Sequence, residues 1–219
     1  MSQLRRILSL AFGVCISLSV SPFASAQFFA TRGSWPVNLA PYYIAVGDFN
    51  QDGNQDMVMA GDNLSGQVGV FLGHGNGTFQ RAVYYDVGAY PKSIAVADLN
   101  NDGQVDLAVA NLTNVGILFG NGDGTFQAQK RVGLGADPIG ISVGDFNGDQ
   151  ILDLATVNDG GTFSILLGNG DGTFQAPLFT KPATLPRTFG VGDFNRDGKL
   201  DVVTAGYSQL DVFIGNGDV

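Results

Sequence analysis

The sequence predicts an all-β protein of short antiparallel strands, and three observations lead to this prediction. A nine-residue pattern, Asp-x-Asn-x-Asp-x-x-x-Asp, occurs four times, at 48–56, 98–106, 145–153 and 193–201. Short apolar runs such as 94–97 and 107–110 flank these Asp loops, as in strands buried on both faces. No helical periodicity appears after the first 26 residues. Four strands in each repeat of about 40–50 residues are typical of a β-propeller blade.

A glycine turn follows each Asp loop and completes the repeat. The first copy, 73–79, reads Gly-His-Gly-Asn-Gly-Thr-Phe, with further copies at 120–126 and 168–174 and a shorter one from Gly215. Such turns need the positive φ that glycine and asparagine tolerate. A proline stands seven residues before every Asp loop, at Pro41, Pro91, Pro138 and Pro186.

The spacing between the two motifs separates constant from variable parts of the repeat. The first glycine of each turn precedes the next Asp loop by 25 residues in every case, whereas the last aspartate precedes the following glycine by 17, 14, 15 or 14 residues. The variation lies in the connection from the second to the third strand, which we expect on the face opposite the Asp loops. Loops on a rigid scaffold often carry binding specificity. These connections are 61–67, 111–114, 158–162 and 206–209.

The first 26 residues have the features of an export signal. Arg5 and Arg6 precede an apolar run, and Ala24-Ser25-Ala26 forms a small-residue cleavage site. The mature chain, 27–219, is then secreted, extracellular or at the cell surface, with no membrane insertion after cleavage. Because the single cysteine, Cys15, lies in the signal, stability must come from a core, a metal or both.

The charge of the chain excludes several partners. All 20 acidic residues are aspartate, and loss of Arg5 and Arg6 changes the net charge from −9 to −11. Nucleic acid and anionic membranes are therefore excluded as partners, since both require a basic surface. Aspartate without glutamate is typical of carboxylates in tight turns.

The Asp loops carry the chemistry expected of calcium sites. Calcium prefers six to eight oxygen ligands, and alternate carboxylates followed by a backbone carbonyl wrap one side of the ion. Three carboxylates within nine residues would repel one another without a counter-ion. In each loop we expect ligands from the side chains at positions 1, 3, 5 and 9 and the carbonyl at position 7. They are Asp48, Asn50, Asp52, Asn54 and Asp56; Asp98, Asn100, Asp102, Gln104 and Asp106; Asp145, Asn147, Asp149, Ile151 and Asp153; and Asp193, Asn195, Asp197, Lys199 and Asp201.

Up to four Ca²⁺ ions, one per loop, would bring the net charge to −3. Magnesium fits less well because it demands a strict octahedron, and zinc or copper would need histidine or cysteine. The loop is not an EF-hand, because Met59 stands where an EF-hand has glutamate. The third loop has Gln150 where the others have glycine. If position 6 needs positive φ, this costs roughly 1 kcal/mol, partly relieved by Gly148, and the third site is expected to be the weakest.

The Asp loops and the segment 167–175 resemble FG-GAP/VCBS-type repeats, which form the propeller head of integrin α subunits and occur in bacterial secreted proteins. The resemblance covers 27–219 and implies calcium in the loop between the first two strands of a blade. Since such propellers usually have seven blades, we expect an incomplete seven-bladed propeller whose open blade edges favour self-association. The alternative is a closed four-bladed ring, in which 28–37, aligned with 79–87, supplies the last strand.

No catalytic or cofactor-binding residue emerges from the sequence. The Gly-x-Gly runs lead into strands and not into a helix N-terminus, which argues against phosphate binding. His74, the single histidine, is expected to be a turn residue. We interpret Trp35, Tyr42 and Tyr43 as packing residues, with a sugar-stacking surface as the alternative.

The predicted function is a non-catalytic binding or adhesion module for an extracellular protein or glycan, in which calcium is structural. The alternatives are a lectin-like or accessory propeller of a polysaccharide-active enzyme and a purely structural surface protein.

Overall fold

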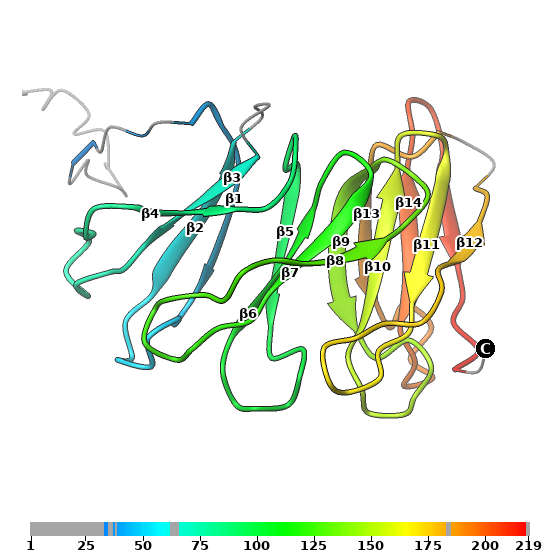
Figure 1. Ribbon diagram of the computed structural model, residues 1–219. Coiled ribbons are helices and arrows are strands. Elements are labelled where there is room, and N and C mark those ends of the chain that lie inside the picture. Colours follow the sequence, from blue (N-terminus) through cyan, green and yellow to red (C-terminus); the bar gives the residue numbers. More distant parts are fainter. Residues whose placement is uncertain (1–32, 35–36, 38, 62–65, 183–184, 218–219) are drawn as a thin grey trace, which may run out of the picture. The chain divides into compact units, whose positions relative to one another are not determined.

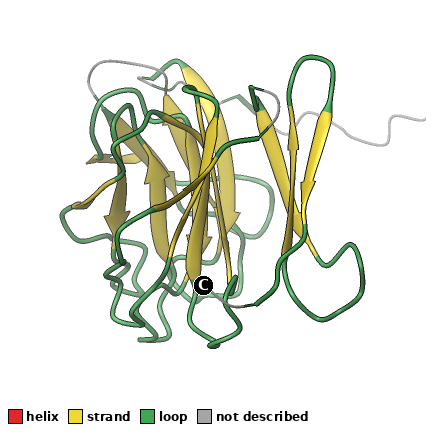
Figure 2. Cartoon of the chain, turned by 90° about the vertical axis from the view of Figure 1, so that its right-hand side faces the viewer, coloured by secondary structure: helices red, strands yellow, loops and turns green. Residues whose placement is uncertain are grey.

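The computed structural model of the chain describes residues 33–34, 37, 39–61, 66–182 and 185–217. The predicted export signal, Trp35 and most of 28–37 lie outside these residues. All regular structure in the described part is β-strand (Figures 1 and 2). No helix there is long and apolar enough to span a membrane. The all-β prediction is confirmed.

In the described part of the chain, fifteen strands form four separate antiparallel sheets. In chain order they are β1 (Pro41–Gly47), β2 (Asp56–Gly61), β3 (Gln67–Phe71), β4 (Val83–Asp86), β5 (Ser93–Ala97), β6 (Asp106–Ala110), β7 (Asn114–Leu118), β8 (Lys130–Gly133), β9 (Pro138–Gly144), β10 (Asp153–Asn158), β11 (Thr162–Leu166), β12 (Leu178–Thr180), β13 (Thr188–Gly192), β14 (Asp201–Ala205) and β15 (Leu210–Phe213).

Each sheet is one repeat, folded as a meander in which consecutive strands are neighbours. The first three sheets have four strands each, and the described part of the fourth has three, in the order β13-β14-β15. The second strands β6 and β10 are buried along their whole length, as the short apolar runs predict. The outer strand β12 is exposed at every residue.

Successive sheets pack against one another through their first strands and their faces. Strand β1 contacts β5, β5 contacts β9, and β9 contacts β13. The core between the first two sheets contains Val58 and Val70 from one side and Leu107 and Val109 from the other. Equivalent cores lie between the second and third sheets and between the third and fourth. These cores explain the period of the sequence, because each repeat must bury both of its faces.

The outermost faces of the array are exposed where their repeat equivalents are buried. Ile44 of β1 is 54% exposed, whereas Ile94 at the same position of β5 is 2% exposed. Val212 of β15 is 56% exposed, whereas Ile117 of β7 is fully buried. Among the described residues, the first and fourth sheets do not pack on each other as neighbouring sheets do. The blades therefore form a propeller-like array without closure, while a total of seven blades stays a prediction.

The interpretation of Tyr42 as a packing residue is wrong. Tyr42 is 65% exposed and Tyr43 is 39% exposed at the start of β1. The repeat equivalents of Tyr42, at 92, 139 and 187, are also half-buried or exposed, so this position lies outside the core in every repeat.

The first glycine of each glycine turn is required by close packing. Gly120 has an ordinary φ, but a Cβ atom there would meet the carbonyl oxygen of Val105 well inside van der Waals contact. We expect Gly120→Ala to lower the free energy of unfolding by about 1–3 kcal/mol, as overpacking does. Urea unfolding measures this. Gly133→Ala is the control, because a Cβ atom at Gly133 meets no atom within 4 Å. Equal losses in the two variants would contradict the packing argument.

Candidate metal centres in the Asp loops

The four Asp loops occupy equivalent places, each joining the first and second strands of a sheet. The glycine turns join the third and fourth strands, so antiparallel order places both motifs at one end of each sheet. The variable connections follow the second strand and lie at the other end. Both features of this arrangement agree with the placement expected from the sequence.

The first aspartate of each loop binds backbone N–H groups of its own loop. In the first loop, Asp48 Oδ1 accepts a hydrogen bond from the N–H of Asp52 at 3.1 Å, and Oδ2 accepts one from Gly53 at 2.9 Å. The other loops repeat both bonds at their equivalent positions. This carboxylate therefore shapes the loop before any ligand is considered.

The asparagine at position 3 and the aspartate at position 5 form the second part of the network. Asn50 Nδ2 donates to Asp52 Oδ2 at 3.0 Å, and Asp52 Oδ1 accepts from the N–H of Asn54 at 2.8 Å. The Asn54 N–H and the Asn50 amide hold the pKa of Asp52 below its usual value. The Asn195 amide and the Lys199 N–H do the same for the pKa of Asp197. In these two loops the aspartate at position 5 is thus poised to stay ionised.

The aspartate at position 9 is fully buried and connects the two motifs. Asp106 Oδ2 accepts from the N–H of Leu99 at 2.9 Å, and Oδ1 accepts from the N–H of Gly120, also at 2.9 Å. The same pair of bonds occurs in all four repeats. The carboxylate therefore closes the base of the hairpin formed by the second and third strands, whose connecting loop varies in length between repeats. This role was not predicted from the sequence, although the apolar run that starts directly after each ninth aspartate indicated a buried strand there.

Burial makes two of these carboxyl groups weaker acids than usual. Burial raises the pKa of Asp106 to about 6, although the hydrogen bonds from the N–H groups of Gly120 and Leu99 lower it. The negative charges of Asp102 and Asp98 add to the rise. Burial also raises the pKa of Asp153, and Asp149 and Asp145 act in the same direction. The loop carboxylates are thus close enough to interact electrostatically.

These raised pKa values predict a pH dependence for the calcium-free protein. Since the folded-state pKa of Asp106, about 6, exceeds the ordinary 3.8, this group adds stability at low pH that is lost as the pH rises through 6. We expect the chain that has been stripped of calcium and kept in calcium-free buffer to need more urea for unfolding at pH 5 than at pH 7. In calcium the order should reverse, because ligands must be ionised. Asp106→Ala is the control and should reduce the difference in calcium-free buffer; a full difference in that variant would contradict the assignment.

Each loop contains two residues in the left-handed backbone region. Position 6 has positive φ in all four loops, including Gln150 at 68°, as expected from the sequence. Position 4 also has positive φ, at Gln51, Asn101, Gly148 and Arg196. Every loop therefore carries one glycine and one other residue in this region. Backbone strain therefore does not distinguish the third loop from the others. The reason for expecting the third loop to be the weakest calcium site no longer holds.

We expect Gln150→Gly to stabilise the protein by about 0.5–1 kcal/mol, because it removes a left-handed side chain. Urea unfolding in EGTA isolates this strain from calcium binding. The double variant Gly148→Gln/Gln150→Gly is the matched control, because it gives the third loop the first six residues of the first. The double variant should differ from the unchanged chain by less than about 0.5 kcal/mol. A destabilised Gln150→Gly variant would contradict the strain assignment.

The loops also hold neighbouring sheets together. Gln51 Nε2 donates to the carbonyl of Gly103 at 2.9 Å and to Gln104 Oε1 at 2.8 Å in the next Asp loop. Asn101 Nδ2 donates to the carbonyl of Gly170 in the next glycine turn at 3.3 Å. Ordering one loop therefore supports the adjacent repeat.

The donor set of each loop fits calcium. Every expected side-chain ligand is a carboxylate or an amide oxygen, and the two left-handed residues fold these groups into one short loop. Three acidic side chains do not converge on a common point anywhere in the described residues. The carboxylate oxygens of the Asp loops accept hydrogen bonds from backbone N–H groups, and each oxygen keeps a further lone pair. Ligation by the twenty expected residues stays a prediction.

His74 occupies the place expected of a turn residue. It is exposed, and its N–H donates to the carbonyl of Thr78 at 2.9 Å. Asn121 and Asn169 make the same backbone bond in the sister turns.

Comparison with known proteins agrees with this geometry. Solved structures with similar folds include an Agrocybe aegerita lectin that recognises non-reducing terminal N-acetylglucosamine. It shares 22% identity with a TM-score of 0.57, over 85% of this chain and 51% of the lectin chain. BBS1N, solved in complex with ARL6DN, shares 16% identity with a TM-score of 0.56, over 82% of this chain and 53% of its own. The chain thus spans about half the length of these proteins. No curated protein sequence matches it.

The model of the FG-GAP-like repeat matches three overlapping segments, 48–109, 98–156 and 145–204. Each segment starts at the first aspartate of an Asp loop and extends into the next repeat. Together they cover well over half of the chain, and the chain therefore belongs to the FG-GAP-like repeat family.

Proposed function

We propose that this protein is a secreted, calcium-binding β-propeller that acts as a non-catalytic binding or adhesion module for an extracellular protein or glycan. The observation that carries this proposal is the separation of the two ends of each sheet. The Asp loops belong to the constant part of every repeat and connect neighbouring sheets, so calcium there is structural. The variable connections at the opposite end are free to differ in shape and chemistry.

Aromatic side chains at the variable end support a recognition surface. Tyr207, between β14 and β15, is 78% exposed, and its ring lies 4.4 Å from the Arg187 guanidinium carbon. Tyr42 is also exposed at the start of β1, which by antiparallel order lies at the same end of its sheet. Exposed tyrosine rings offer an apolar face and a hydroxyl group, a combination suited to sugars and to protein surfaces.

Glycans are the ligand class to test first. The fold is similar to that of a lectin specific for terminal N-acetylglucosamine. At 22% identity this likeness concerns the fold, so it guides the choice of ligand and leaves the sugar open.

A glycan array probed with the full chain in calcium and in EGTA tests the proposal. We expect binding to at least one class of glycan in calcium and its loss in EGTA as the loops loosen. Tyr207→Ala should reduce this binding. Phe194→Ala is the matched control, because Phe194 is a 53% exposed aromatic residue in an Asp loop, at the opposite end. Equal effects of the two variants, or no binding to glycans and extracellular matrix proteins, would refute the proposal.

A further inference from the structure

The fourth position of the glycine turn carries an amide in the first repeat and a carboxylate in the next two. It is Asn76 in the first turn, and Asp123 and Asp171 in the second and third. In each turn the Oδ1 atom at this position accepts hydrogen bonds from both the backbone N–H and the hydroxyl group of the threonine two residues later. The three turns therefore hold this oxygen atom in the same way, whichever residue supplies it.

The two threonine donors favour a negatively charged oxygen atom. In the second and third turns, the hydrogen bonds from the threonine hydroxyl and N–H groups hold the pKa of Asp123 and the pKa of Asp171 below the usual value. In the first turn, the Thr78 N–H and hydroxyl donate to Asn76 Oδ1 at 3.0 and 2.6 Å. Donors placed in this way stabilise an oxyanion that develops on a carbonyl oxygen. The first turn thus holds a neutral amide where the surroundings favour a negative charge.

The group that can attack this amide is the backbone nitrogen of Gly77. Asn76 is exposed and is followed directly by Gly77, which has no side chain to cover its nitrogen. Within the described part of the chain, neither the Gly77 N–H nor Asn76 Nδ2 makes a hydrogen bond. Gly77 also lines a groove of about 360 Å³ between the turn and residues 53–55 of the first Asp loop, so water has access to it.

We propose that Asn76 is a site of spontaneous deamidation that the turn promotes. The Gly77 nitrogen loses its proton to water and attacks Asn76 Cγ. The new N–Cγ bond closes a succinimide ring, and the Cγ–Nδ2 bond breaks to release ammonia. Water then opens the ring: cleavage of the bond to Cγ gives aspartate, the residue of the sister turns, and cleavage of the bond to the main-chain carbonyl carbon gives isoaspartate. Either product adds a negative charge at the Asp-loop end, whether or not the variable end binds a ligand.

Other Asn-Gly pairs of the chain lack this arrangement. They begin at Asn121, Asn147, Asn169 and Asn216. The Nδ2 atoms of Asn121 and Asn169 donate to threonine hydroxyl groups at 2.8 and 2.9 Å. Asn147 Nδ2 donates to Asp149 Oδ2 at 2.9 Å. In these three pairs an acceptor holds the leaving nitrogen, and no two donors meet on the Oδ1 atom among the described residues. They should therefore react more slowly than Asn76.

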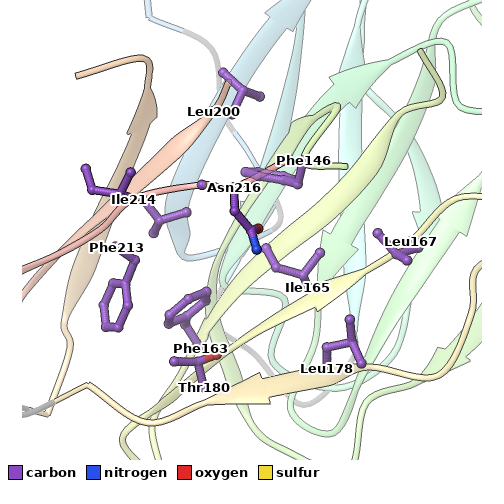
Figure 3. Close-up of a pocket in the computed structure, with 12 residues that line it drawn as sticks. Phe146, Phe163, Ile165, Leu167, Leu178, Thr180, Leu200, Phe213, Ile214 and Asn216 are labelled. Carbon is purple, nitrogen blue, oxygen red and sulfur yellow. The ribbon is translucent and has the colours of Figure 1, made fainter. Parts of the chain in front are cut away.

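The pair at Asn216 has different surroundings. Asn216 lines a cavity of about 290 Å³ between the third and fourth sheets, and Figure 3 shows its amide directed toward Ile165. Apart from Asn216, Thr180 is the only residue of this lining whose side chain can form hydrogen bonds. The lining therefore offers no pair of donors to an oxyanion, and we expect Asn216 to react as slowly as the other three.

Peptide mapping by mass spectrometry tests the proposal, because every Asn-Gly pair is measured in the same sample. The full chain is kept in neutral buffer with calcium at 37 °C, and the mass increase from amide to carboxylate is followed at each asparagine. We expect Asn76 to be converted at least about fivefold faster than Asn121 or Asn169. In guanidinium chloride, which removes the turns, the rates should lie within about twofold of one another. Equal rates in the folded chain, or an unchanged ratio in denaturant, would overturn the proposal.

Variants of Thr78 test the role of its hydroxyl group. Thr78→Val keeps the shape of the side chain without the hydroxyl donor, and should slow the conversion of Asn76 by roughly three- to tenfold. Thr78→Ser keeps the donor and should stay within about twofold of the unchanged chain. Thr125→Val is the matched control, because it makes the same change in the second turn and should leave the rate at Asn76 unaltered. An unchanged or faster rate in Thr78→Val would overturn the assignment, since the threonine would then only restrain the turn.

Discussion

Removing calcium with excess EGTA is expected to lower the midpoint of thermal unfolding by roughly 5–20 °C relative to 1 mM calcium. Extracellular sites of this kind have dissociation constants of about 0.1–1 mM, so each contributes roughly 0.4–1.4 kcal/mol under these conditions. The four loops share the aspartates at positions 1, 5 and 9, the asparagine at position 3 and the left-handed backbone at positions 4 and 6, so their contributions should accumulate. Differential scanning calorimetry of residues 27–219, with readdition of calcium, measures the shift.

Two controls assign this shift to the loops. Magnesium at the same concentration should restore little of the lost stability, because it binds poorly outside a strict octahedron. Asp102→Ala should remove about one quarter of the calcium-dependent stability, since Asp102 is an exposed member of one loop of four. An unchanged melting midpoint in EGTA would rule out calcium as a structural ion in this protein.

The sequence predicts the repeat, the sheets and the position of the loops because these depend on local patterns. The apolar runs at 94–97 and 107–110 became β5 and β6 almost residue for residue. The role of Asp106 escaped prediction because its second partner, Gly120, lies across a hairpin of variable length. The left-handed residues at position 4 escaped it because Gln51, Asn101 and Arg196 share no residue type.

Longer-range features were beyond the reach of local patterns. Ile44 is exposed although its repeat equivalents Ile94 and Ile141 are buried, because no described sheet packs on that side of β1.

The second large effect is expected at the buried aspartate of the hairpin base. Asp106→Ala should lower the free energy of unfolding by about 2–4 kcal/mol, because the buried N–H groups of Leu99 and Gly120 both lose their acceptor. Relief of the buried charge offsets part of this loss, as the raised pKa of Asp106 indicates. Urea unfolding in EGTA measures the effect without any contribution from calcium.

Asp102→Ala separates the two roles that an aspartate of the loop can have. Asp102 is exposed and accepts the Gln104 N–H and the Asn100 amide, so in EGTA its loss should cost less than about 1 kcal/mol. In calcium its cost should rise by the contribution of one site, whereas the cost of Asp106→Ala is large in both conditions. If both variants are harmless in EGTA, the buried carboxylate does not hold the hairpin base. If the Asp106→Ala loss also grows in calcium, the residue is both a ligand and the connection between the Asp loop and the glycine turn.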